Sequence, residues 1–120
     1  MITEDYVSFE VAKLLKDKGF NEPTIGTYNI ESKNPILVER PIRAIHCEAI
    51  ISAPTLQMAM KWLREVYNIH IVPIHVENKN YRVKINGLSI FELDNPSIYL
   101  YGKYEYVIDF AIKYALEHLI

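Results

Sequence analysis

Hydrophobic and polar positions change period several times along the chain, and these changes predict the order of its helices and strands. The first regular stretch, SFEVAKLLKDKGF (residues 8–20), repeats apolar residues at helical spacing. Its apolar stripe consists of Val11, Leu14 and Leu15. Ser8 suits the N-cap, because its hydroxyl can accept from a first-turn N–H, and Gly19 suits the left-handed residue after the last turn. Residues 8–20 are therefore predicted to be a helix.

A second helical pattern covers APTLQMAMKWLREVYN, residues 53–68, with Pro54 expected in its first turn. Its apolar face consists of Leu56, Ala59, Met60, Leu63, Val66 and Tyr67. Met58 and Trp62 fall on the flank between this face and the polar one, and their spacing of four residues makes them neighbours.

Beyond residue 68 the apolar repeat shortens to two residues, the period of a β-strand. NIHIVPIHV (68–76) leads through a turn at 77–80 into YRVKIN (81–86), where apolar and polar residues alternate. A bulge at Pro73 would turn four apolar side chains inward and two histidines outward. The inward four are Ile69, Ile71, Ile74 and Val76, and the histidines are His70 and His75.

The remaining segments complete an α+β pattern. Residues 24–31 favour a strand, and 33–50 a short edge strand or an extended loop, because two prolines there remove N–H groups from any ladder. SIYLY (97–101) is expected to be a short final strand after a turn at 94–96, and the spacing is helical again from residue 103.

These elements predict an α+β fold, with helices packed on one face of a small, mainly antiparallel sheet in the order α-β-α-β-β-β-α. One residue near the centre of each helical stripe is expected to be fully buried. These residues are Leu14, Leu63 and Ala111.

Composition places the chain among ordinary globular domains, as a single domain over residues 1–120. Half of the 120 residues are hydrophobic, and 13 Lys and Arg against 15 Asp and Glu leave a net charge of −2. This balance gives no reason to expect nucleic acid or an anionic membrane as an obligatory partner. No apolar run approaches the roughly twenty residues of a membrane span, and the acidic start differs from a secretory signal, so a cytoplasmic protein is expected.

Three stretches, SFEVAKLLKDKGF, APTLQMAMKWLREVYNIHI and KYALEHLI, together resemble a group of small proteins of unknown function. That group is encoded in phage-like or other mobile regions of gut-bacterial genomes. The last helix departs from the Tyr-Glu-Glu-Ala-like start of the group, since YEYVIDFA has Tyr106 in place of the second acid. The resemblance implies a bacterial or phage protein of the cytoplasm and carries over no catalytic residue.

Histidines and the single cysteine are the candidate metal-binding or catalytic residues. Five strand residues span roughly 16 Å, so His70 and His75 cannot chelate one ion between them. A metal site would need recruits such as His46, Cys47 or His118. Cys47 beside His46 invites a nucleophile–base interpretation, but neighbouring residues rarely face each other and no acid is placed to orient the histidine. We expect no metal, no cofactor and no catalytic residue.

Two surfaces are candidates for binding. Strand alternation puts Arg82 and Lys84 outside, and the same alternation in SIYLY puts Tyr99 and Tyr101 outside. On one sheet face, these four could grip a peptide or stack single-stranded bases. The second surface is the flank with Met58 and Trp62, which either joins two copies of the chain or lies beneath the loop at 31–47.

The sequence therefore favours a non-enzymatic binding or accessory protein that acts through protein–protein contacts, with another protein or as a homodimer. A single-stranded nucleic-acid-binding module is the alternative, against which the acidic net charge argues. A small enzyme of unrecognised type is the second alternative.

Overall fold

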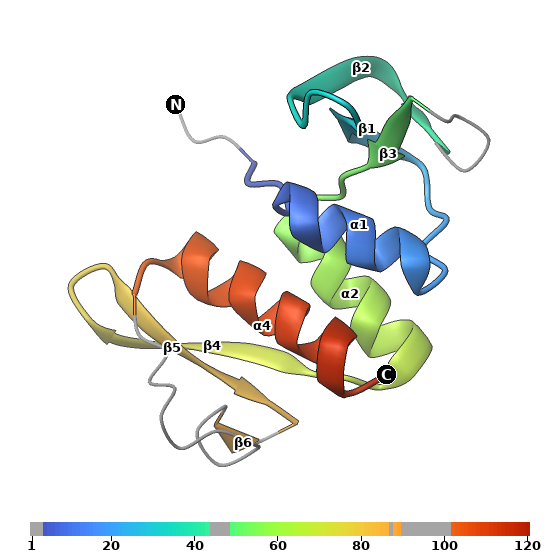
Figure 1. Ribbon diagram of the computed structural model, residues 1–120. Helices are drawn as coiled ribbons and strands as arrows, with labels where there is room; N and C mark the ends of the chain where they lie inside the picture. The colour runs from blue at the N-terminus through green and yellow to red at the C-terminus, as the bar shows by residue number, and fades with distance from the viewer. Residues whose placement is uncertain (1–3, 44–48, 87, 90–101) are drawn as a thin grey trace. The chain divides into compact units, whose positions relative to one another are not determined.

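The structure is a computed structural model that describes residues 4–43, 49–86, 88–89 and 102–120 (Figure 1). These residues form three helices and six strands. The elements are α1 (Phe9–Asp17), β1 (Thr24–Asn29), β2 (Pro35–Ile42), β3 (Ile50–Ser52), α2 (Leu56–Tyr67), β4 (Ile71–Glu77), β5 (Asn80–Ile85), β6 (Leu88–Ser89) and α4 (Tyr104–His118). The strands pair antiparallel in two sheets, ordered β2-β1-β3 and β4-β5-β6. The α+β class is confirmed, with the strands divided between two sheets.

Contacts divide the chain into two compact units, Met1–Ala59 and Met60–Ile120, and the boundary falls within α2. The first unit contains α1 and the sheet of β1, β2 and β3. The second contains the last turns of α2, the sheet of β4, β5 and β6, and α4. The prediction of a single domain over residues 1–120 stays a prediction.

Helix α1 begins and ends where the sequence predicts. The Ser8 hydroxyl accepts a hydrogen bond from the Val11 N–H at 3.3 Å, and Gly19 adopts a left-handed φ of 96° after the last turn. Phe20 then folds back, and its N–H donates to the Leu15 carbonyl at 2.9 Å. The buried residues of the helix are Val11, Ala12 and Leu15. Leu14 is only partly buried, so its predicted full burial is wrong, because the buried stripe is centred on Ala12 and Leu15.

The first sheet has β1 at its centre, and Gly26 on this strand leaves no space for a side chain. A Cβ there would collide with the Ala53 carbonyl and lie 2.6 Å from the ring of Tyr6. The chain before α1 is held by the Val7 N–H, which donates to the Pro54 carbonyl at 3.0 Å. The absence of a side chain at Gly26 therefore lets three segments of the chain meet closely.

Strand β2 confirms the edge strand, one of the two alternatives predicted for residues 33–50, because within the described residues it pairs only with β1. Its register against β1 jumps from Gly26↔Leu37 to Thr24↔Ile42, which leaves β2 with more residues than its partner and bends it. Residues 44–48 lie outside the described part of the chain.

Helix α2 begins at Leu56, about one turn after the start predicted at residue 53. The Thr55 hydroxyl accepts from the Met58 N–H at 3.1 Å, so Thr55 is the N-cap and Pro54 precedes the helix. At the other end Asn68 has φ 55°, and the Ile69 N–H donates to the Leu63 carbonyl at 3.1 Å. This geometry is a Schellman-type stop with asparagine in place of glycine.

Four of the six residues predicted on the apolar face of α2 are buried: Leu56, Ala59, Met60 and Leu63. Val66 and Tyr67 are exposed instead, so the buried stripe of α2 ends at Leu63, one turn before the helix does. The predicted burial of Leu63 is confirmed, and so is that of Ala111 in α4.

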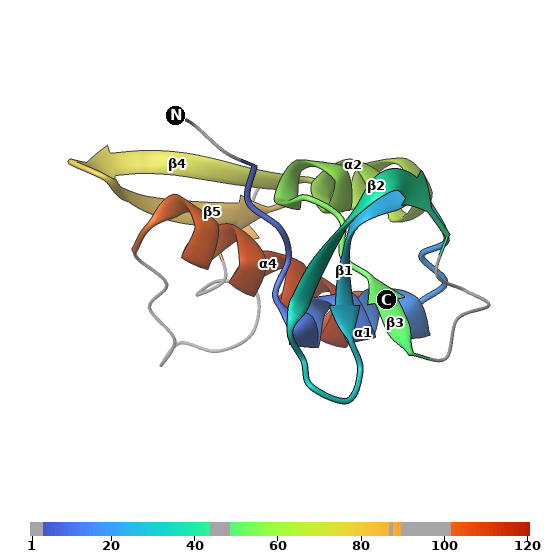
Figure 2. The ribbon, with the colours of Figure 1, turned by 90° about the horizontal axis from the view of Figure 1, so that it is seen from above.

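In the second unit, α4 lies along one face of the β4–β5 hairpin, as both ribbon views show (Figures 1 and 2). Val83 and Ile85 of β5 are buried. The buried residues of α4 are Val107, Ile108, Ala111, Ile112, Tyr114, Ala115 and Leu116, a band wider than one helical stripe. Gly102 makes an isolated bridge with Tyr81, whereas the strand predicted at 97–101 and the turn at 94–96 lie outside the described residues.

Candidate binding surface

The β4–β5 hairpin carries the two cationic positions that strand alternation predicts to be exposed. Two residues connect the strands, since Glu77 pairs with Asn80, and Asn78 takes a left-handed φ of 49° in this turn. Asparagine tolerates that backbone conformation better than most side chains do. The turn therefore makes Glu77 and Asn80 the first pair between β4 and β5.

A β-bulge next to the turn sets which side chains share a face. Beyond Glu77↔Asn80 the next pair is His75↔Tyr81, so Val76 is the extra residue on β4. The following pairs are Ile74↔Arg82, Pro73↔Val83, Val72↔Lys84 and Ile71↔Ile85. Without the bulge, the same turn would place Ile74 opposite Val83, on the covered face. One extra residue thus turns Ile74 to the other side.

The inner face of the hairpin consists of Ile71, Pro73, His75, Tyr81, Val83 and Ile85. This is the side on which α4 lies, because the ring of Tyr81 packs edge-on against Tyr104 of α4 with centroids 5.3 Å apart. His75 adds to this aromatic group, with its ring centroid 5.3 Å from that of Tyr81.

The outer hairpin face consists of Val72, Ile74, Arg82 and Lys84, with the pair Glu77 and Asn80 at its turn end. Val72 is 50% exposed and Ile74 37%, and the bulge residue Val76 beside them is 43% exposed. Arg82 and Lys84 are exposed as well. A row of branched aliphatic side chains on β4 therefore runs beside a row of cations on β5. Antiparallel sheets with one covered face ordinarily turn polar residues toward water, so the aliphatic row is the unusual part.

The sequence interpretation missed Val72, Ile74 and Val76. It placed the bulge at Pro73 and turned Ile74 and Val76 inward, which is wrong, because the bulge lies between His75 and Glu77. No residue type marks a bulge in this strand. The alternation of YRVKIN was the usable signal for this face. It puts Arg82 and Lys84 outside, and any residue of β4 that pairs with them must lie on the same face.

The two histidines are held by local partners on different parts of the hairpin. The Nε2–H of His70 donates to Asn68 Oδ1 at 2.8 Å, and the Nε2–H of His75 donates to the Asn78 carbonyl at 2.6 Å. The predicted placement of both on the outer face is wrong for His75, which the register puts on the inner face with Tyr81. Among the described residues, no group of three His, Cys, Asp or Glu side chains gathers around a metal-sized space.

Of the other predicted site residues, Met58 and Trp62 lie one turn apart on α2. Met58 is 39% exposed, whereas Trp62 is 9% exposed and its ring packs edge-on against Tyr67 at 5.3 Å. Trp62 therefore offers little area to a partner. Tyr99 and Tyr101 lie outside the described residues, so the predicted basic and aromatic face is described only at Arg82 and Lys84.

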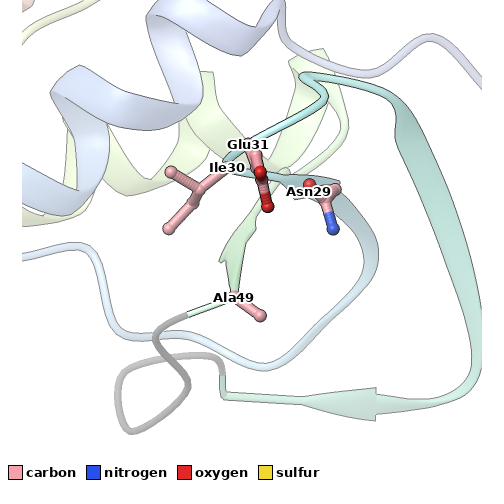
Figure 3. Close-up of a pocket in the computed structure, with 4 residues that line it drawn as sticks. All are labelled: Asn29, Ile30, Glu31 and Ala49. Carbon is pink, nitrogen blue, oxygen red and sulfur yellow. The ribbon is translucent and has the colours of Figure 1, made fainter.

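A small hollow lies where β1 ends, and Figure 3 shows the described residues that line it: Asn29, Ile30, Glu31 and Ala49. Its volume is about 170 Å³. Asn29 Oδ1 already accepts from the Ser32 N–H at 2.8 Å, and the Ile30 N–H donates to the Ala49 carbonyl at 3.0 Å. Glu31 is the one ionisable group among the described lining residues, so these residues bring no pair of groups together for acid–base chemistry.

Comparison with known proteins adds no family. No protein-family model, no curated protein and no solved structure matches this chain. The resemblance to phage-like proteins therefore stays a prediction. Within the described residues, no helix has the length and apolar character needed to cross a membrane.

Proposed function

We propose that this protein is a non-enzymatic binding protein that acts through protein–protein contacts, with the outer hairpin face as its contact surface. One observation carries the proposal: Val72 and Ile74, with Val76 beside them, are exposed on a sheet whose opposite face lies against α4. Burying such side chains against a partner is favourable by roughly 25 cal/mol for each Å² of apolar surface removed from water. Exposed apolar clusters of this kind mark interaction sites more often than isolated exposed residues do.

The face serves docking better than the edge of the same sheet does. Within the described residues β4 is an edge strand, since it pairs only with β5. Pro73 lies in the middle of β4 and has no N–H, so a strand added along this edge would lack a hydrogen-bond donor there. The β4 edge is thus protected against strand pairing while Val72 and Ile74 stay exposed on the outer hairpin face.

Single-stranded nucleic acid is the second candidate partner, and the exposed Arg82 and Lys84 on one face are the observation that favours it. Such cations can contact phosphates, but an open-sheet reader also needs aromatic rings on which bases stack. The aliphatic row on β4 supplies no such ring. Protein is therefore the better-supported partner.

Site-specific photo-cross-linking in cells that express the protein tests this function. A cross-linking side chain at position 74 should join one protein, which mass spectrometry identifies. The matched control is position 66, since Val66 is 56% exposed but lies on α2. The identified protein, once purified, should bind the unmodified chain and lose affinity to Ile74→Thr but not to Val66→Thr.

Equal products from positions 66 and 74 would contradict the proposal, and so would equal affinity of the two threonine variants. An RNA or DNA cross-link specific to position 74 would favour the second candidate instead.

A further inference from the structure

We infer that the occupant of the outer hairpin face is an acidic amphipathic helix of a partner protein. This inference rests on the proposed function and adds the chemistry and shape of the partner. It is drawn from the order of side chains on β4 and β5 and from the backbone needs of the segment that would cover them.

The positive charge beside the aliphatic row of the outer hairpin face favours a partner with negative charge. The two charges beside Val72 and Ile74 are both cationic, Arg82 and Lys84, and they outnumber the one acid of the face, Glu77 at its turn end, in a chain whose net charge is −2. An arginine has five N–H donors, so it can receive a carboxylate even when some of its donors are engaged within the chain. A partner with Asp or Glu beside its apolar residues complements both rows.

A second copy of this chain complements the face poorly. In a two-fold symmetric contact the same patch meets itself, so each copy offers the other two cations, Arg82 and Lys84, against the one acid Glu77. Like charges brought together in this way weaken the contact. The charge pattern therefore selects a different protein over a homodimer at this face.

The backbone of the occupant favours a helix. An extended segment laid on a sheet face leaves its own N–H and C=O groups without partners, whereas a helix satisfies them internally. The hairpin already receives α4 on its inner face, so helix-on-sheet packing is a geometry this sheet supports.

The spacing of the two rows also fits a helix. Alternate residues on a strand, such as Val72 and Ile74, are about 6.6 Å apart, and neighbouring strands are separated by about 4.8 Å. Four helical residues rise about 6 Å, so a helical row of apolar residues at every fourth position follows β4 closely. An adjacent row of Asp and Glu on the same helix then lies over Lys84 and Arg82.

Selection from a displayed library of random peptides, each about 16 residues long or about four helical turns, tests the inference with the whole chain as target. We expect the enriched peptides to be acidic, to repeat apolar residues at helical spacing, and to gain helical circular dichroism on binding. Val72→Thr with Ile74→Thr should abolish their binding. Arg82→Glu with Lys84→Glu should weaken it about tenfold, as expected for two exposed ion pairs.

Two control variants separate a loss of peptide binding from a failure of the double variant to fold. Arg82→Lys keeps the charge and should retain binding, and Lys84→Glu alone gives a second reversal if the double variant does not fold. Peptides that depend on Val72 and Ile74 but are neutral, basic or extended would overturn the acidic-helix inference and leave the proposed function standing. The absence of any peptide that depends on Val72 and Ile74 would overturn both.

Discussion

Gly26 shows how single residues decide the packing of the first unit. It lies in the central strand β1, directly beneath the ring of Tyr6 and beside the Ala53 carbonyl. The Ala53 N–H donates to the Gly26 carbonyl at 2.8 Å, and the Tyr28 hydroxyl donates to the Val7 carbonyl at 2.7 Å. The Tyr28 bond ties the segment before α1 to the sheet, and the Ala53 bond lies at the close approach that glycine allows.

Gly26→Ala should therefore destabilise the protein by about 1–3 kcal/mol, the usual cost of extra volume in a packed site. The matched control is Gly102→Ala, where a Cβ would lie 3.5 Å from Tyr106 Cδ1, an ordinary contact. Chemical denaturation of both variants measures the difference. A loss at Gly26 no larger than at Gly102 would show that Tyr6 and Ala53 do not pack there.

The two leucines Leu14 and Leu63 make a second comparison at the residue scale. Leu63 is fully buried, whereas Leu14 is only partly buried. Leu63→Ala should cost about 2–5 kcal/mol, and Leu14→Ala less than about 2 kcal/mol, because a partly exposed site leaves a smaller cavity. Equal losses in urea denaturation would contradict the described phase of α1 or α2.

At the scale of elements, local signals predicted the helices better than the pairing of the strands. Ser8 and Gly19 mark the ends of α1 because capping acts within one turn, and the spacing of apolar residues placed the buried half of α2. The outer hairpin face was not predictable in the same way. It depends on the extra residue Val76, and a bulge is a property of two paired strands rather than of one segment.

Deletion of Val76 tests this explanation of the hairpin. The deletion should remove the bulge and leave every pair from His75↔Tyr81 to Ile71↔Ile85 unchanged, so the loss of stability should stay below about 2 kcal/mol. If β4 instead ran in regular register from the turn, the deletion would move each of its side chains to the opposite face. A loss above about 4 kcal/mol in denaturation would therefore contradict the bulge.

At the scale of the whole molecule, the chain combines a net charge of −2 with an outer hairpin face on which two cations outnumber one acid beside three exposed aliphatic residues. The predicted contact surface at Met58 and Trp62 stays a prediction, and the low exposure of Trp62 makes it the smaller of the two surfaces. The predicted homodimer is likewise untested. If two copies of the chain joined through Met58 and Trp62, another protein could still bind the outer hairpin face, provided that the dimer contact does not cover that face.

Labelling of a cysteine at position 74 with a membrane-permeant maleimide measures directly whether the outer hairpin face is covered in the cell. The native Cys47 is first replaced by alanine, and Val66→Cys on α2 serves as the exposed control. We expect Ile74→Cys to react readily in the purified protein and at least several-fold more slowly in cells, while Val66→Cys reacts alike in both. Equal rates at position 74 in cells and in the purified protein would contradict a partner on this face, and slow labelling already in the purified protein would assign the cover to a second copy of the chain.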